Sequence, residues 1–279
     1  MTAPAPAVRL AVCADDFGLS GGVNDAIVEL VGKNRLSAFS CLVDAPAFRP
    51  AAARLAALAA SADIGLHLNF TESFGEQAPR FALGAVLGRA YARMLVPAAI
   101  HAEIRRQLDS FEDACGFAPH HVDGHQHVQQ LPVLRDALLA ELEARYRTRR
   151  PWLRSGLPPR APGPSLFARE RVKPFVLGTL GARALLREAA QRGFVTNRHL
   201  LGVYDFTGSV ADYSARLHRW LEQAGDGDLL MTHPGRGEQG GDPIAAARRR
   251  EYEVLAGDAF AQALAARGVV VTRLSQWPT

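Results

Sequence analysis

The chain has 279 residues, of which 48% are hydrophobic and 22% charged, with 25 glycines, 17 prolines and three cysteines. This composition is typical of a globular protein and excludes the disordered, collagen-like and disulfide-scaffold classes. No apolar run approaches the ~18 residues of a membrane helix, and residues 1–6 lack the basic and apolar regions of a signal peptide. We therefore expect a cytoplasmic protein with no integral membrane segment. Its length fits one α/β barrel or two smaller domains.

The net charge of +4 is carried almost entirely by arginine, since only Lys33 and Lys173 are lysines. Proteins that bind nucleic acid concentrate their basic residues on one face. Here those residues are scattered, apart from short runs at 147–150 and 248–250 that we expect on solvated surfaces. We predict no nucleic-acid partner. The cysteines have no Cys-x-x-Cys spacing and are expected to be reduced and partly buried.

Short apolar runs alternate with amphipathic stretches along the whole chain. Strands are predicted at residues 8–14, 38–43, 64–69, 121–123, 229–232 and 269–272, and helices at 20–31, 50–60, 97–115, 132–146 and 244–267. This alternation predicts an α/β fold with parallel strands and helices packed outside them. Two excursions, near 71–96 and 149–173, are interpreted as loops over a site. Because the pattern continues on both sides of them, we expect a single domain spanning residues 1–279.

Four of the nine histidines crowd into the segment His-His-Val-Asp-Gly-His-Gln-His at residues 120–127. In an extended chain His121, Asp123, His125 and His127 would share one face, because side chains alternate. Three imidazoles and a carboxylate make a poor core surface and a good metal site. The structural alternative is a solvated polar loop.

Three further strand ends carry polar side chains. Asp15 and Asp16 close the first strand, His67 lies at the end of the third, and His233 follows residues 229–232. α/β folds place ligands at the carboxyl ends of their strands, so all these residues are expected on one rim. Neighbouring residues of a strand point apart, so one aspartate can bind a cation while the other acts as a base. A capping pair and a core histidine are the structural alternatives.

One carboxylate and two imidazoles leave open positions on a cation, which is the composition of a hydrolytic metal site. The sequence contains neither a Gly-x-Ser-x-Gly elbow nor a phosphate-binding P-loop. The residues therefore favour metal-assisted hydrolysis over serine-hydrolase or nucleotide chemistry.

Four segments, in order and spanning roughly residues 8–235, resemble the YdjC-like carbohydrate deacetylases, the group that contains chitooligosaccharide deacetylase. The segments are Ala14-Asp15-Asp16-Phe17-Gly18-Leu19-Ser20, Gly65-Leu66-His67, His121-Val122-Asp123-Gly124-His125-Gln126-His127 and Thr232-His233-Pro234. The resemblance implies a variant (β/α) TIM-like barrel that removes the acetyl group from an N-acetylated sugar.

By the same resemblance, Asp16, His67 and His125 would bind one divalent metal ion, zinc or magnesium. Asp15 would be the general base toward the attacking water, and His233 the general acid toward the leaving amine. Residues expected to face the substrate or support the ligands are Asp123, His127, His121 and Asn69.

The choice of histidine ligands has an alternative. The more distant NodB-like deacetylases take both from a His-x-x-x-His motif, which His121 and His125 would satisfy. We favour His67 with His125, because the Gly-Leu-His segment matches the closer family. The chain departs from that family at Gln129, where a further histidine often follows, and residues 151–197 match none of its segments. Both departures bear on the substrate more than on the chemistry.

The predicted partner is an acetylated amino sugar, as an oligosaccharide or a glycolipid headgroup, and a homodimer stays open. Arginines expected to meet a polar substrate from the excursions are Arg80, Arg154 and Arg160. Two other functions compete. An amidohydrolase-type hydrolase of a cyclic amide or nucleobase would use the His125-x-His127 pair, although that pair is usual on a first strand. The other competing function is that of a metal-containing barrel that catalyses no reaction.

Overall fold

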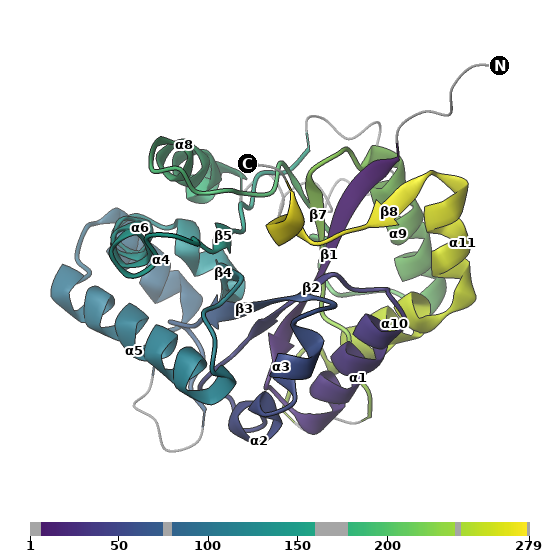
Figure 1. Cartoon of the computed structure of the whole chain (residues 1–279), viewed down its shortest axis with the longest axis horizontal. Helices are drawn as coiled ribbons and strands as arrows, with labels where there is room; N and C mark the ends of the chain where they lie inside the picture. The colour runs from purple at the N-terminus through teal and green to yellow at the C-terminus, as the bar shows by residue number, and fades with distance from the viewer. Residues whose placement is uncertain (1–6, 75–79, 160–177, 238–240, 278–279) are drawn as a thin grey trace.

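The computed structural model describes residues 7–74, 80–159, 178–237 and 241–277 (Figure 1). Its centre is one sheet in the order β5-β4-β3-β2-β1-β7-β6, with β8 also paired to β1. The strands are β1 (Val8–Phe17), β2 (Ala38–Cys41), β3 (Asp63–Leu68), β4 (His121–Gly124), β5 (Trp152–Leu153), β6 (Leu200–Leu201), β7 (Asp228–Thr232) and β8 (Val269–Val271). The strand pairs within the described residues are all parallel, which confirms the α/β class.

The two ends of the sheet approach each other. The amide of Leu153 donates to the carbonyl of Val195 at 2.9 Å, and the amide of Leu200 donates to the carbonyl of Leu157 at 2.7 Å. A parallel bridge joins Leu153 to Thr196. The sheet is therefore curled into a distorted barrel within a single α/β domain, as the resemblance implied.

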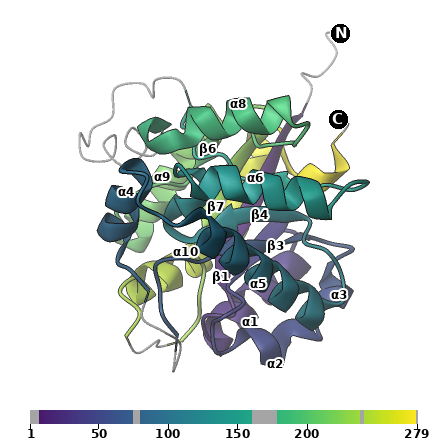
Figure 2. The ribbon, with the colours of Figure 1, turned by 90° about the vertical axis from the view of Figure 1, so that its left-hand side faces the viewer.

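Helices surround the curled sheet (Figures 1 and 2). They are α1 (Gly21–Gly32), α2 (Phe48–Ala52), α3 (Leu55–Leu58), α4 (Leu83–Tyr91), α5 (Pro97–Cys115), α6 (Leu134–Arg145), α8 (Arg183–Gln191), α9 (Val210–Gln223), α10 (Ala245–Ala256) and α11 (Asp258–Ala266), with short turns η1 (His125–Gln130), η3 (Gly178–Ala182) and η4 (Leu274–Gln276). The Ser20 hydroxyl accepts a hydrogen bond from the Val23 amide and so caps α1. Gly116, in the left-handed region, ends α5 as predicted. Within the described part of the chain, no helix combines the length and apolarity needed to cross a membrane.

Several element predictions were wrong in detail. The helix expected at 50–60 is two short helices, and the one at 244–267 is broken where Gly257 is extended. The 71–96 excursion contains α4, whereas the 149–173 excursion lies partly outside the described residues. The helices α8 and α9 and the strands β5 and β6 were not predicted. The two strands have two residues each, which is too short for a periodic pattern of apolar residues.

The alternation of side chains along β1 explains the position of Asp15. Leu10, Val12 and Ala14 belong to the large apolar core, while Ala11 and Cys13 belong to a smaller cluster with Trp152 and Met231. Alternation therefore directs the next odd-numbered residue, Asp15, toward the same side as Cys13. The position of the polar site follows from this register.

Candidate metal centre and active site

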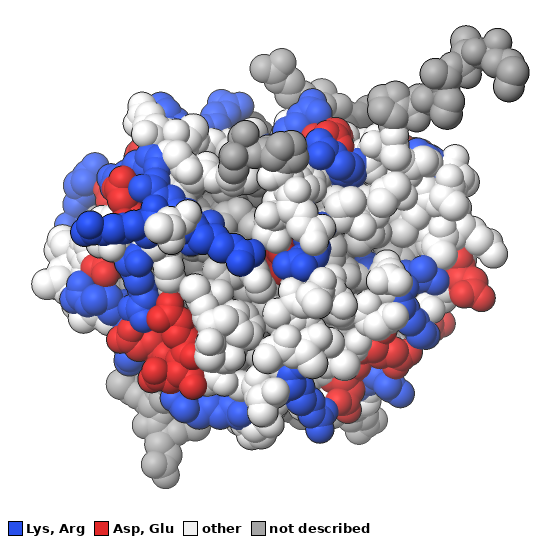
Figure 3. Space-filling view, in the orientation of Figure 1, with Lys and Arg blue, Asp and Glu red and all other residues white. Residues whose placement is uncertain are grey.

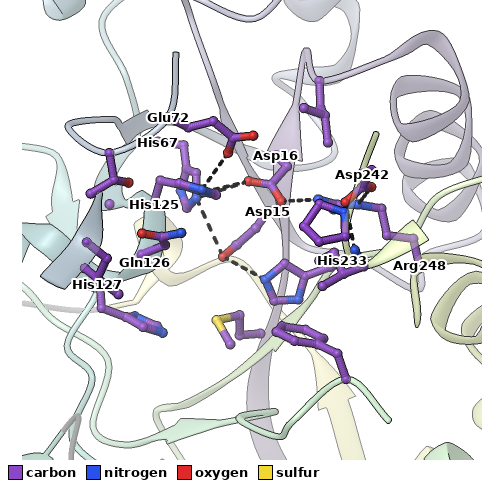
Figure 4. Close-up of a pocket in the computed structure, with 18 of the residues that line it drawn as sticks. Asp15, Asp16, His67, Glu72, His125, Gln126, His127, His233, Asp242 and Arg248 are labelled. Atoms are coloured by element: carbon purple, nitrogen blue, oxygen red, sulfur yellow. Dashed lines mark hydrogen bonds and ion pairs between the residues drawn. The ribbon is translucent and has the colours of Figure 1, made fainter. Parts of the chain in front are cut away.

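A cavity of about 1040 Å³ opens where β1, β3, β4 and β7 end. All five residues predicted for metal binding or catalysis line it: Asp15, Asp16, His67, His125 and His233 (Figure 4). The structure thus brings together side chains that are up to 218 positions apart in the sequence (15 to 233). His127 lines the same cavity, while the further predicted residues lie elsewhere.

Asp16 owes its direction to an irregularity in β1. The register of β1 against β2 shifts between Ala14 and Phe17, and Asp16 has a φ of 69°, in the left-handed region. Regular alternation would send Asp16 to the helix side with Ala14, so the bulge turns it back to the cavity. The two adjacent carboxylates can therefore share one cavity and still have different neighbours.

Asp16 lies among three cationic or nitrogen-bearing groups. Its Oδ2 accepts from Nη2 of Arg248 at 2.7 Å, and its Oδ1 lies 3.2 Å from Nδ1 of His125 and 3.4 Å from Nε2 of His67. Burial alone would raise the pKa of Asp16, but Arg248 and then His125 bring it well below its usual value. Asp16 is therefore an ionised acceptor whose Oδ1 faces two imidazoles.

The orientation of His67 is set from behind by Asp123. Its Nδ1 lies 2.7 Å from Oδ1 of Asp123 and 3.1 Å from the hydroxyl oxygen of Ser40. Nδ1 is thus the protonated nitrogen facing the carboxylate, which leaves Nε2 with a lone pair toward Asp16. A histidine held in this way by a carboxylate is the usual arrangement of a metal ligand.

His125 does not follow an extended chain as predicted. It opens the turn η1, in which Gln126 and His127 both have left-handed backbones, because the chain bends after Gly124. Its Nδ1 faces Asp16, and its Nε2 lies 2.9 Å from a carboxylate oxygen of Glu72. Burial would lower the pKa of His125, but the hydrogen bonds that it donates to Asp16 and Glu72 raise it to about 10. The position stabilises positive charge.

Asp16, His67 and His125 fit a divalent cation. One atom from each lies within 4.8 Å of the others, and the set offers one carboxylate oxygen and two imidazole nitrogens. Three such protein ligands leave positions open for water and substrate. Both imidazoles also have a carboxylate on their other nitrogen, from Asp123 and Glu72.

A second cluster of ligand-type side chains, Cys13, His121 and Asp123, lies outside the cavity lining, and a third group, Asp15, His67 and Asp123, takes residues from both sides. Nη2 of Arg154 lies 3.0 Å from the Cys13 sulfur, 2.5 Å from Oδ1 of Asp15 and 2.5 Å from Oδ2 of Asp123. Arg154 is fully buried, so its guanidinium already supplies the cation that these carboxylates need. None of Cys13, His121, Asp123 and Arg154 lines the cavity.

Asp15 connects Arg154 with the cavity. Its Oδ2 accepts from Nη1 of Arg154 at 2.7 Å and lies 3.7 Å from Nε2 of His233. Burial would raise the pKa of Asp15, but Arg154 and then His67 hold it below its usual value. Asp15 is therefore an ionised carboxylate with an imidazole as its neighbour.

Glu251 of α10 lies behind His233. Its carboxylate accepts the backbone amide of His233 at 2.5 Å and the Tyr204 hydroxyl at 2.7 Å, and its Oε1 is 3.9 Å from Nδ1 of His233. Glu251 is fully buried, and Phe206 packs edge-on against the imidazole with ring centroids 5.1 Å apart. These contacts direct Nε2 of His233 toward Asp15 and the cavity.

Two of the predicted residues are sealed away from the cavity. His121 is fully buried and stacks on Trp152 with ring centroids 4.1 Å apart. The ring also covers Gly65, where any side chain would collide with it. Asn69 is buried as well, and its amide bonds the backbone of Thr71 and Glu72. Asn69 thereby shapes the turn that carries Glu72 to His125.

The arginine expectations need correction. Arg154 cannot meet a substrate, because it is buried against Asp15 and Asp123. Arg80 is engaged by Asp44 at 2.8 Å and Glu103 at 2.7 Å, and Arg160 lies outside the described residues. Arg248, expected on a solvated surface, is 3% exposed and also pairs with Asp242 at 2.6 Å.

Three residues of the site were missed, Glu72, Arg248 and Glu251, whereas Arg154 was expected to meet a substrate and pairs with Asp15 instead. Arg248 lies 232 positions from Asp16 and Arg154 lies 139 positions from Asp15, while Glu251 lies 18 positions from His233. Their local sequence carries no signal, since an arginine or glutamate on a helix or loop is ordinarily solvated. The expectation for the three cysteines, that they are reduced and at least partly buried, is confirmed.

Comparison with known proteins extends these findings. The family profile described as "YdjC-like protein" matches residues 9–266. A chitooligosaccharide deacetylase from Serratia marcescens is 30% identical over 232 residues, which cover 81% of this chain and 81% of that protein. A carbohydrate deacetylase from Danio rerio is 33% identical over 147 residues, or 48% of this chain and 46% of that protein. The chain thus spans about half the length of the carbohydrate deacetylases that it matches from Danio rerio, mouse and human.

A solved structure shares the fold. A protein from Enterococcus faecalis, provisionally named for cellobiose-phosphate cleavage, superposes with a TM-score of 0.70 at 20% identity. The superposition covers 96% of this chain and 97% of that one. The curled parallel sheet is therefore a fold already observed in a crystal.

Proposed function

This chain belongs to the YdjC-like family, and on that premise we propose that it is a metal-dependent deacetylase acting on an N-acetylated amino sugar. The substrate is an oligosaccharide or a glycolipid headgroup, and the products are acetate and the free amine. One observation carries the proposal. Asp16, His67 and His125 converge at the cavity while Asp15 and His233, 3.7 Å apart, face the same space.

In this proposal Asp16, His67 and His125 hold the divalent ion. The bound ion would acidify water and polarise the acetamide carbonyl. His67 is preferred to His121 as a ligand because its Nε2 is 3.4 Å from Asp16, whereas His121 is sealed behind Trp152. Asp123 and Glu72 keep the two ligand imidazoles oriented.

Asp15 is the proposed general base. It is ionised and lines the cavity, so it can take a proton from the water that attacks the carbonyl carbon. Arg154 grips both oxygens of this carboxylate and fixes its direction. Arg154 is a positioning residue, because it does not reach the cavity.

His233 is the proposed general acid. Its Nε2 faces the cavity, from which it can donate a proton to the nitrogen of the leaving amine as the C–N bond breaks. Glu251 is the group placed to stabilise the protonated imidazole, through the 3.9 Å approach of Oε1 to Nδ1. The two proton transfers balance, since Asp15 gains one and His233 loses one.

The amidohydrolase alternative gains no support from the geometry. It requires His125 and His127 to bind one ion together. Among the described residues, the group that contains His125 and could hold one cation also contains Asp16 and His67. His127 belongs to none of these groups of described residues. His127 follows His125 by two residues in the same turn η1 with a left-handed backbone, and burial lowers its pKa to about 3.

An acetate-release screen with metal analysis tests the proposal. Purified protein would be offered acetylated chitooligosaccharides, monosaccharides and glycolipids, with Asp15→Asn as the matched variant. We expect about one bound divalent ion in both proteins, and a rate lower by about 10²–10⁴-fold in the variant. Bound metal with no acetate release from any substrate would favour a barrel without turnover. Full activity in Asp15→Asn would remove Asp15 as the base.

A further inference from the structure

Large hydrophobic side chains are exposed on and around α4. Five large hydrophobic residues are exposed among the described residues, and four of them lie between positions 81 and 96. They are Phe81, Tyr91, Met94 and Val96, with 54%, 48%, 70% and 64% of their surface exposed, and we name them the α4 patch. Clusters of exposed apolar side chains on a folded protein mark interaction surfaces.

The residues of the α4 patch flank, along the chain, two leucines that line the catalytic cavity. Leu83 and Leu87, one turn apart on α4, line that cavity. The helix buries only Val86 and Ala90. Figure 2 shows α4 at one edge of the molecule. A single short helix therefore presents apolar side chains both to the cavity and to the outside.

Charge points to the kind of partner. Residues 81–100 contain two arginines, Arg89 and Arg93, and no aspartate or glutamate. The guanidinium of Arg89 lies over the ring of Phe81, 4.0 Å from its centroid. Apolar side chains mixed with arginine and free of carboxylates are the composition of an element that lies in an anionic lipid interface.

A second copy of the chain is a poorer occupant for this surface. A twofold contact through the α4 patch would bring Arg89 and Arg93 against their own copies. The segment offers no carboxylate to neutralise them. Lipid phosphates would neutralise both, so charge complementarity favours a lipid surface.

We propose that the α4 patch docks this protein on an anionic lipid surface, so that the cavity receives an acetylated amino sugar carried by a lipid. The substrate part of the proposal rests on the proposed deacetylase function. The docking part rests only on the patch, its arginines and the two cavity-lining leucines of α4.

Vesicle flotation tests the docking without turnover. The full chain would be mixed with vesicles of phosphatidylcholine alone, or of phosphatidylcholine with phosphatidylglycerol. We expect binding to the mixed vesicles only. The double variant Met94→Ser/Val96→Ser should lose at least about tenfold in affinity, because it withdraws apolar area from the interface. Arg89→Gln and Arg93→Gln should each cost about fivefold.

Two matched controls separate docking from general effects. Val270→Ser removes the fifth exposed hydrophobic residue, 48% exposed on β8, and should bind vesicles like the unmodified protein. Arg187→Gln removes an exposed arginine of α8 and should also leave binding unchanged. Absence of vesicle binding, or equal losses in Val270→Ser and in the patch variants, would overturn the proposal.

Sedimentation and acetate release from a soluble sugar distinguish lipid docking from contact between copies and from loss of catalysis. If the patch variants convert a dimer to a monomer in sedimentation, and vesicles do not bind, the α4 patch is a contact between copies. Acetate release from a short soluble acetylated sugar should be the same in the Met94→Ser/Val96→Ser protein as in the unmodified one. Vesicle binding without any acetate release would refute the proposed function and leave the docking intact.

Discussion

Among the described residues, three groups of ligand-type side chains could hold a cation. Two of them share no residue, and only one of these two, the upper cluster, opens to the cavity. The upper cluster is Asp16, His67 and His125, and the lower cluster is Cys13, His121 and Asp123. Both contain histidine and aspartate at similar spacing, yet the lower one is closed by Trp152 and neutralised by Arg154. Ligand types and spacing are therefore insufficient to define a metal centre. Access to the cavity completes the definition, since each cluster is paired with a buried arginine, Arg154 at the lower one and Arg248 at the upper one.

The largest expected effect comes from breaking the upper cluster. Asp16→Ala or His67→Ala should abolish stable metal binding and lower acetate release by about 10⁴-fold or more, because the ion supplies several kcal/mol to the transition state. Metal content of the purified proteins and single-substrate kinetics measure both effects.

The matched variant in the lower cluster is His121→Ala, which should keep the ion. If His121→Ala loses the metal and His67→Ala retains it, the assignment of the two clusters is reversed.

Removing the resident cation of the lower cluster should cost stability. Arg154→Met leaves Asp15 and Asp123 buried without a positive neighbour, which should lower the free energy of unfolding by about 3–5 kcal/mol. Denaturant titration measures it, with the exposed Arg187→Met as a control expected within about 0.5 kcal/mol. Equal stability of the two variants would show that Arg154 is not the required counter-ion.

The lower cluster should also make stability depend on pH. Burial lowers the pKa of His121 to about 4, whereas in the unfolded chain it titrates near its ordinary value of 6.5. At a pH between these two pKa values, His121 is protonated in the unfolded chain and neutral in the folded one. The free energy of unfolding should therefore fall as the pH falls through this window, by up to about 3 kcal/mol.

The contribution of His121 can be isolated by comparing denaturation curves at neutral and mildly acidic pH. His121→Gln should flatten the pH dependence of the unfolding free energy, and the half-buried His218→Gln should not. An unchanged pH dependence in His121→Gln would mean that this imidazole does not control it.

The smallest expected effect is at Asp123, which belongs to the lower cluster and contacts His67 of the upper one. Its Oδ1 faces His67 and its Oδ2 pairs with Arg154. Asp123→Asn keeps the shape but weakens the orientation of His67, so metal affinity should drop about 10–100-fold. Competition with a chelator measures it. Loss of folding in place of weaker binding would assign Asp123 to the lower cluster alone.

Much of the architecture was readable from the chain. The strands that form the site, β1, β3, β4 and β7, were predicted within one to three residues at each end. The apolar runs of β1, β3 and β7 and the polar alternation around Asp123 in β4 mark them as strands, and parallel strands present their carboxyl ends on one edge. Both ends of α5 were predicted correctly, because Pro97 marks its first turn and Gly116 follows its last residue.

The extended face expected for residues 121–127 failed for a local reason. The prediction assumed that the strand continues past Gly124, but Gln126 and His127 adopt left-handed backbones. A single residue with positive φ reverses which way a side chain points, and non-glycine residues give no warning of it. His125 and His127 were therefore expected on one face and are found with different neighbours.

Residue order was enough to indicate which chemical groups reach the rim, since strand alternation and strand direction are local properties. It could not indicate how those groups are neutralised. Arg154 and Arg248 lie 139 and 232 positions from the aspartates they pair with, and each is buried only because the barrel closes around it. Charge pairing in a folded interior depends on distances through space, so the packing of the barrel selected the open cluster and sealed the other.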